Sequence, residues 1–215
     1  MKRQVTMEEI SDGKLYTAND MVKADCNDCK NCSACCRGMG SSIVLDPLDV
    51  HRLCTGLGQN FEQLMADKLE LQVVDGIVLP NLKMTGEQEQ CAFLNEEGRC
   101  SIHELRPGIC RLFPLGRFYE NGGFQYFLQV HECKNQNRTK IKVKKWIDTP
   151  QLGKYEKYIT DWHYFLKESE EKAEEDENER KRISMEILKQ FYLLPFDKNI
   201  DFYEQFDKRR KQIFD

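Results

Sequence analysis

The stretch CNDCKNCSACC, residues 26–36, decides what kind of fold this chain can adopt, because it places cysteines at positions 26, 29, 32, 35 and 36. Two thiols separated by two residues can bind one metal. The short loop between them lets both sulfurs sit about 2.3 Å from Zn²⁺ or on neighbouring irons of one cluster. Five thiols exceed the four that one tetrahedral ion accepts. The run therefore predicts ligands for two metal positions or for a polynuclear cluster.

Five further cysteines lie downstream, and none follows Cys133. Cys91 and Cys100 flank a turn expected at residues 95–98, and a hairpin there would make them cross-strand neighbours about 4.5–5.5 Å apart. Cys54 falls on the apolar face of an expected helix, so we predict a core residue and not a ligand. Eight candidate ligands, enough for two four-cysteine sites, are Cys29, Cys32, Cys35, Cys36, Cys91, Cys100, Cys110 and Cys133.

Two segments carry a family resemblance: CKNCSACC at residues 29–36 and CAFLNEEGRCSIHELRPGICRLFP at residues 91–114. They resemble the bacterial YkgJ-type cysteine-cluster family, a zinc- or iron-chelating domain with a CxxCxxCC signature. The resemblance covers residues 26–133 and implies metal ligation by the eight cysteines named above. Cys26 precedes the family motif, and three readings stay open: a spare ligand, a replacement ligand or an exposed thiol.

The same resemblance sets the functional alternatives. It favours an iron–sulfur cluster over zinc, and a cluster of this type also occurs in flagellin lysine N-methylases, which adds a methyl-transferring enzyme as an alternative. No general base, nucleophile or cofactor loop is visible in the sequence, which weighs against an enzyme. The plainest alternative is a zinc-stabilised protein-interaction module without redox chemistry.

Charged and imidazole side chains near the cysteines are secondary candidates. Four thiolates around Zn²⁺ or a doubly positive four-iron core leave negative charge, which the guanidinium groups of Arg37, Arg106 and Arg111 can neutralise. His103 and His131 lie close in sequence to Cys100 and Cys133. We expect ordinary polar histidines there rather than ligands.

Composition limits the partners. The chain has 215 residues, with 32 Lys and Arg against 36 Asp and Glu, so its formal charge of −4 gives no overall attraction to nucleic acid. Five cations at residues 138–145 suggest a phosphate contact, a solvated edge or a surface that docks the acidic run at 168–179. We find no membrane-spanning stretch and no signal-peptide pattern, so we expect a cytoplasmic protein. In a reducing compartment dense cysteines bind metal more often than they form disulfides.

Hydrophobic periodicity and turn residues predict the elements. Asp46-Pro47 should open a helix that ends near Gly56, and Asn60 should cap a second helix that runs through Leu69. Hairpins are expected at residues 72–79, 91–102 and 112–130. Beyond residue 140 the apolar spacing is helical, with a solvated helix end or flexible connector at 168–179.

These elements predict an α+β fold, in which a small cysteine-rich metal-binding unit of short antiparallel hairpins and short helices precedes a helical C-terminal region. The expected domains are residues 20–137 and residues 138–215. The predicted function is metal binding through an iron–sulfur cluster or iron or zinc ions, with roles in metal handling, electron transfer or metal-dependent modification. A protein partner would bind through the helical C-terminal region.

Overall fold

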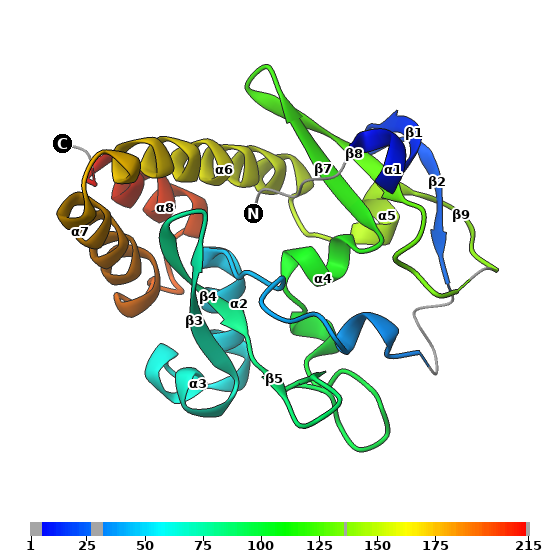
Figure 1. The fold of residues 1–215 in the computed structure, drawn as a ribbon, viewed down its shortest axis with the longest axis horizontal. Coiled ribbons are helices and arrows are strands. Elements are labelled where there is room, and N and C mark those ends of the chain that lie inside the picture. The colour runs from blue at the N-terminus through cyan, green and yellow to red at the C-terminus, as the bar shows by residue number, and fades with distance from the viewer. Residues whose placement is uncertain (1–5, 27–31, 136, 214–215) are drawn as a thin grey trace. The chain divides into compact units, whose positions relative to one another are not determined.

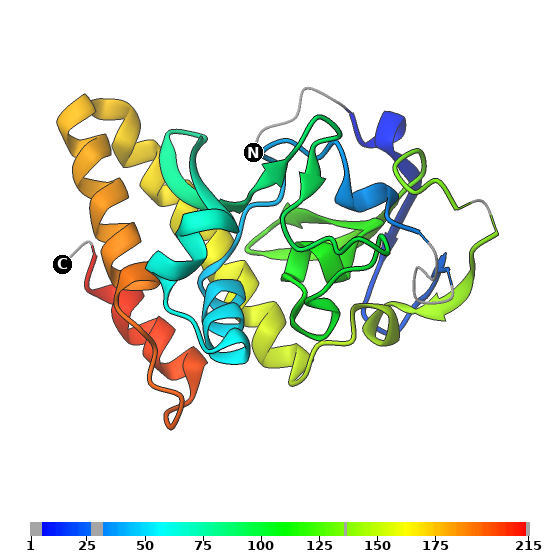
Figure 2. The same cartoon turned by 90° about the horizontal axis from the view of Figure 1, so that it is seen from below.

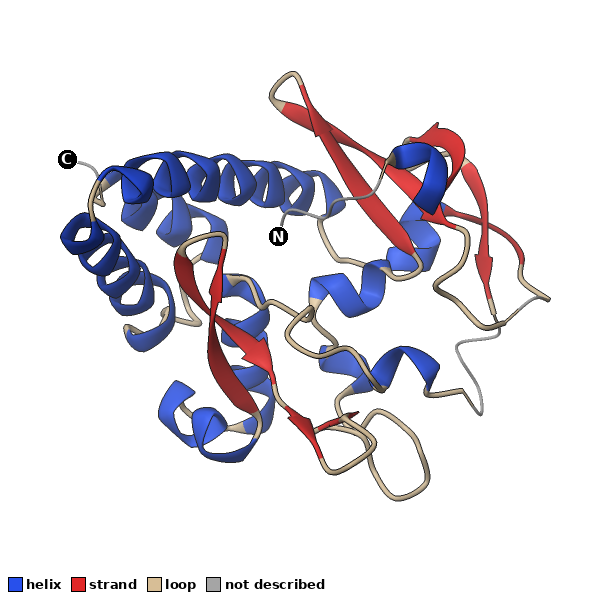
Figure 3. Cartoon of the chain, viewed as in Figure 1, coloured by secondary structure: helices blue, strands red, loops and turns tan. Residues whose placement is uncertain are grey.

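A computed structural model describes residues 6–26, 32–135 and 137–213. It is a mixed α+β protein with short antiparallel strand pairs and a helical C-terminal region, as the sequence predicts (Figures 1 and 3). Within the described residues no helix is long and apolar enough to cross a lipid bilayer.

The chain divides into two compact units, each built from two separate segments. Unit 1 comprises Gly40–Lys83 and Lys157–Asp215, and unit 2 comprises Lys2–Met39 and Met84–Glu156. The domain boundary expected at residue 138 stays a prediction. Unit 1 contains α2 (Pro47–Leu57), α3 (Phe61–Asp67), β3 (Leu69–Val74), β4 (Ile77–Leu82), most of α6 (Leu152–Glu175), α7 (Glu177–Leu188), the π-helix η3 (Lys189–Leu193) and α8 (Phe202–Lys211).

Local sequence fixes the first elements of unit 1. The Asp46 carboxylate accepts from the Asp49 N–H at 2.9 Å, and Pro47 takes the first helical position, where its missing N–H costs nothing. Asn60 caps α3 in the same way, through the Gln63 N–H at 2.8 Å. Both predicted helices are confirmed, except that Leu69 begins a strand instead of continuing the second helix.

The β3–β4 hairpin of unit 1 is also confirmed. Its six cross-strand pairs run from Leu69 with Leu82 to Val74 with Ile77. Asp75 and Gly76 have φ of 48° and 90°, the left-handed values that a two-residue type I′ turn requires. α7 packs against β4 (Figure 2), where the Val78 N–H donates to the Ser184 hydroxyl at 3.2 Å.

Aromatic rings from the C-terminal helices fill the core of unit 1. Phe191 lies 5.2 Å from Trp162 and 5.5 Å from Phe206, measured between ring centroids, and Tyr158 lies 4.6 Å from Phe206. These rings come from α6, η3 and α8, so burial of one apolar face of each helix holds the helices together. The apolar side chains predicted at helical spacing beyond residue 140 therefore form a face that packs against neighbouring helices.

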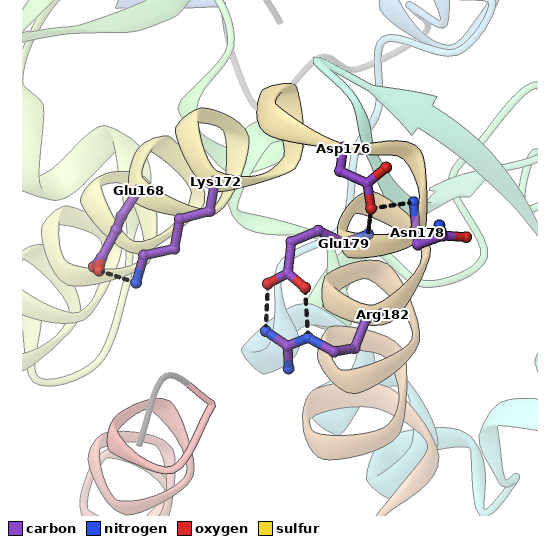
Figure 4. A network of polar contacts seen from close by, with 6 residues as sticks. All are labelled: Glu168, Lys172, Asp176, Asn178, Glu179 and Arg182. Carbon is purple, nitrogen blue, oxygen red and sulfur yellow. Dashed lines mark hydrogen bonds and ion pairs between the residues drawn. The ribbon is translucent and has the colours of Figure 1, made fainter.

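The acidic run at residues 168–179 forms the end of α6 and the start of α7 (Figure 4). Glu168 pairs with Lys172 and Glu179 with Arg182, while Asp176 caps α7 through the N–H groups of Asn178 and Glu179. The solvated-helix reading is thus correct for most of the run. It is wrong for Ser169 and Glu170, which are buried at 0% and 8% exposure.

Unit 2 is built on antiparallel strands. A three-stranded sheet has the order β1-β8-β7, while β2 pairs with β9 and β5 with β6. Side chains such as Val22, Leu115 and Tyr126 form its core, together with Val143 and Ile147. The elements are α1 (Met7–Ile10), β1 (Ser11–Tyr16), β2 (Met21–Asp25), η1 (Ala34–Cys36), β5 (Met84–Thr85), β6 (Gln90–Cys91), η2 (His103–Leu105), α4 (Gly108–Leu112), β7 (Leu115–Glu120), β8 (Gly123–Gln129), β9 (Thr139–Lys142), α5 (Val143–Ile147) and the start of α6.

One of the two hairpins predicted in unit 2 is confirmed and the other is wrong in its register. β7 and β8 join through Asn121 and Gly122, with φ of 51° and 75°. In the segment at residues 91–102 only Leu94 and Cys100 form a bridge, while Cys91 pairs with Met84. The expected facing of Cys91 and Cys100 across a hairpin is therefore incorrect.

Candidate metal centre

The cysteines of unit 2 come from segments that are distant in the sequence. Eight described cysteines belong to this unit, and Cys54 belongs to unit 1. Cys29, a predicted ligand, lies outside the described residues. The other predicted ligands are Cys32, Cys35, Cys36, Cys91, Cys100, Cys110 and Cys133, and all seven lie in unit 2 together with Cys26.

Four of these thiols line one small cavity. Cys26, Cys32, Cys35 and Cys133 surround about 20 Å³ of space. Cys26 directly follows β2, Cys32 and Cys35 lie in the segment that leads into and through η1, and Cys133 lies beyond the end of β8. Burial raises the pKa of the Cys133 thiol, and the nearby thiols of Cys26 and Cys32 raise it further.

The apolar wall of this cavity is anchored by a tryptophan. Phe113, Pro114 and Trp146 line it together with the cysteines. The Trp146 indole N–H donates to the Phe113 carbonyl at 3.1 Å, so α5 holds the ring against the segment that follows α4.

A second set of cysteines lies around η1. Arg37 forms an antiparallel bridge with Gln90, and the Gly38 N–H donates to the Glu89 carbonyl at 2.9 Å. The residues next to this bridge are Cys36 and Cys91, so the two segments bring these cysteines together. A hydrogen bond with Cys36 and burial raise the pKa of Cys35.

Cys100 and Cys110 belong to the segment between β6 and β7, which is largely loop and turn (Figure 3). Burial raises the pKa of Cys100, while the Ile102 N–H and the Arg106 charge oppose the shift and the nearby Cys35 adds to it. Cys110 lies on the short helix α4 and is partly buried. Cys35 thus lies near Cys36 and Cys100, and it also lines the cavity with Cys26, Cys32 and Cys133.

Cys35, Cys100 and Cys133 have raised pKa values, so without a metal their thiols keep their protons near neutral pH. A metal ligates the thiolate, so binding must displace these protons, and the metal's charge supplies the driving force. Burial that disfavours a lone thiolate is compatible with a thiolate that is bonded to a cation. The donor set therefore has the chemistry of a zinc or iron site.

Of the three arginines predicted to neutralise thiolates, Arg106 acts on two described cysteines. Its charge lowers the pKa of Cys35 and of Cys100. For the other two, the structure shows other hydrogen-bond partners, and a role at the thiolates stays a prediction. Arg37 donates to the side-chain carbonyls of Gln88 at 2.7 Å and Gln90 at 3.0 Å. Arg111 donates to the main-chain carbonyls of Glu104, Arg106 and Asp148.

Other polar residues near the first cavity were not identified from the sequence. Lys134 lines the cavity, and the Arg138 charge lowers the pKa of Cys133. Arg138 begins the run of five cations, and residues 139–142 of that run form β9. The role of Arg138 was missed because nothing in the sequence connects β9 to the loop after β8. His131 is exposed and His103 is partly buried.

The described thiols line their cavity without meeting at one point. Among residues 6–26, 32–135 and 137–213, no group of three histidine, cysteine or carboxylate side chains is close enough to hold a metal ion as placed. Metal binding by such cysteines would therefore have to be coupled to rearrangement of their side chains.

Comparison with known proteins links the cysteine-bearing segments to metal chelation. A family model named CxxCxxCC, described as a "putative zinc- or iron-chelating domain", matches residues 28–139, just over half of the chain. No curated protein and no solved structure matches the chain. The match includes every cysteine of unit 2 except Cys26, and it excludes α6, α7 and α8.

Proposed function

The chain belongs to the CxxCxxCC family, and we propose that it is a metal-binding protein whose unit 2 cysteines hold iron, as ions or an iron–sulfur cluster, or zinc. The observation that carries the proposal is the gathering of thiols from the end of β2, from η1, from the segment at residues 91–110 and from the loop after β8. Thiolates are soft ligands that select zinc and iron–sulfur clusters over magnesium or calcium. The protein would work in a reducing compartment such as the cytoplasm, where its thiols stay available.

The proposal is tested by purifying the full chain without oxygen and measuring zinc, iron and acid-labile sulfide per chain. A brown protein with equal iron and sulfide indicates a cluster, which supports a role in electron transfer or metal-dependent modification. A colourless protein with zinc indicates closed four-cysteine sites. If reconstitution with each metal leaves the protein empty, the proposal is wrong.

A zinc-stabilised interaction module is the second candidate, and one observation favours it. Unit 1 exposes Met185, Leu193 and Leu194 at 63%, 48% and 44%, on α7 and around the end of η3. Contiguous exposed apolar side chains are a feature of surfaces that bind protein partners, and Leu193 and Leu194 are adjacent in the chain. In this case unit 2 contributes stability through zinc and no redox chemistry. The methyl-transfer alternative rests on the family resemblance alone.

A further inference from the structure

Cys26 occupies a position that the surrounding strands hold in place. It follows β2, whose partner β9 pairs with it from Met21 with Lys142 to Asp25 with Thr139. The Thr139 hydroxyl donates to the Asp25 carboxylate at 3.2 Å, beside the last of these pairs. Cys26 itself is only 9% exposed, which excludes the reading of an exposed thiol.

The size of the cavity beside Cys26 limits what it can hold. About 20 Å³ is enough for one particle the size of a water molecule or a single ion. A four-iron cluster with its sulfides would need several times this space. The four described cysteines that line the cavity equal the number of ligands that one tetrahedral ion takes.

One nitrogen of a guanidinium group close to Cys133 lacks a hydrogen-bond partner in the described part of the chain. The Arg138 Nη1 is buried and has no hydrogen-bond partner among the described residues. Its charge lowers the pKa of Cys133, and the cavity is lined by one cation, Lys134, and one carboxylate, Glu132. Four thiolates around a divalent ion carry a net negative charge, which a neighbouring guanidinium and ammonium stabilise.

We infer that Cys26, which lies outside the family match, is a metal ligand and forms a four-thiolate site for one ion with Cys32, Cys35 and Cys133. The inference rests on the proposed function, because it assumes that unit 2 binds metal. As placed, these thiols are not close enough to hold an ion, so the site requires the cysteine side chains to move toward one another on binding. The ion is of the zinc class, with mononuclear iron as the alternative of the same coordination.

The test compares the full chain with three variants, Cys26→Ser, Cys133→Ser and Cys54→Ser, each reconstituted with zinc and then with cobalt. Cys54 is the matched control, since it is a partly buried cysteine of unit 1. We expect Cys26→Ser and Cys133→Ser each to bind about one zinc ion fewer per chain, because each removes one thiolate of four. The thiolate-to-cobalt charge-transfer absorption should fall in both, while Cys54→Ser should match the wild type.

A second measurement separates ligation from packing. Trp146 lines the cavity, so in a Trp162→Phe background cobalt binding at this site should quench its emission. Cys26→Ala keeps a small side chain at the buried position, and it should abolish this quenching if Cys26 is a ligand. Retention of zinc, cobalt absorption and quenching in both Cys26 variants, with loss in Cys133→Ser, would overturn the inference and leave the proposed function intact. A wild-type chain that takes up neither zinc nor cobalt would overturn the inference too, and one that also takes up no iron would overturn both.

Discussion

At the scale of single residues, the environment of each thiol distinguishes Cys54 from the cysteines of unit 2. Cys54 lies on α2 and faces a cavity of about 380 Å³ in unit 1, lined also by His51 and Phe61. Burial raises its pKa, and no other thiol contributes to the shift. Its helix face is less buried than a core position requires, because Cys54 is only partly buried and Leu57 is 37% exposed.

We therefore predict that Cys54→Ala leaves the metal content unchanged and lowers the free energy of unfolding by about 1 kcal/mol, through lost packing. Cys110→Ala, by contrast, should lose metal, since it leaves a site one thiolate short. Metal analysis of the two purified variants makes the comparison. Equal metal loss in both would contradict the division of the cysteines between ligand and packing roles.

The spacing of the cysteines predicts which residues carry the chemistry, but it does not predict their neighbours. The turn after Cys91 is closed by Asn95, whose side chain accepts from the Arg99 N–H at 2.7 Å and whose carbonyl accepts from the Gly98 N–H at 2.9 Å. This Asn-centred turn places Leu94, not Cys91, opposite Cys100. A shift in register of this kind is set by local turn chemistry, which symmetric spacing does not reveal.

At the scale of elements, the N-terminus of α2 is held by a side chain from α6. The Tyr158 hydroxyl accepts from the Leu48 N–H at 3.1 Å and donates to the Asp46 carboxylate at 3.0 Å. The same hydroxyl thus accepts a hydrogen bond from an N–H of the first helical turn and donates one to the residue that caps the helix. Tyr158 is buried, so water cannot replace it.

We predict that Tyr158→Phe lowers the free energy of unfolding of unit 1 by about 1–3 kcal/mol, because the buried Leu48 N–H loses its acceptor. Trp162 reports on unit 1 in a Trp146→Phe background, and urea unfolding followed by its emission gives the value. Tyr164→Phe, at a tyrosine that is 36% exposed, is the control and should stay within about 0.5 kcal/mol. An unchanged urea midpoint in Tyr158→Phe would show that the hydroxyl is not needed.

Elements with local signals could be predicted from the sequence, and those with distant partners could not. The caps at Asp46 and Asn60 and the turns at Asp75 and Asn121 each act within a few residues, and all four are confirmed. The strands β1, β2 and β9 were missed. Their partners lie more than 100 residues away in the sequence, as in the pairing of Met21 with Lys142. Only tertiary contacts make these short polar segments into strands.

At the scale of the whole molecule, the two units differ in how they gain stability. Unit 1 buries a continuous set of aromatic rings from α6, η3 and α8. Unit 2 has a smaller apolar core, and its cysteines lie in short helices, strand ends and loops. Small units of this kind commonly need ligand bonds to remain folded. The central claim is that metal held by the cysteines of unit 2 supplies those bonds.

Hydrogen exchange read by mass spectrometry, on the full chain with metal bound and after strong chelation, tests this claim most directly. Loss of metal should speed exchange in the cysteine-bearing segments of unit 2, at residues 32–39, 91–112 and 130–135, and leave α7 and α8 of unit 1 protected. Equal exchange in the unit 2 segments with and without metal, once metal loss has been measured, would contradict the account.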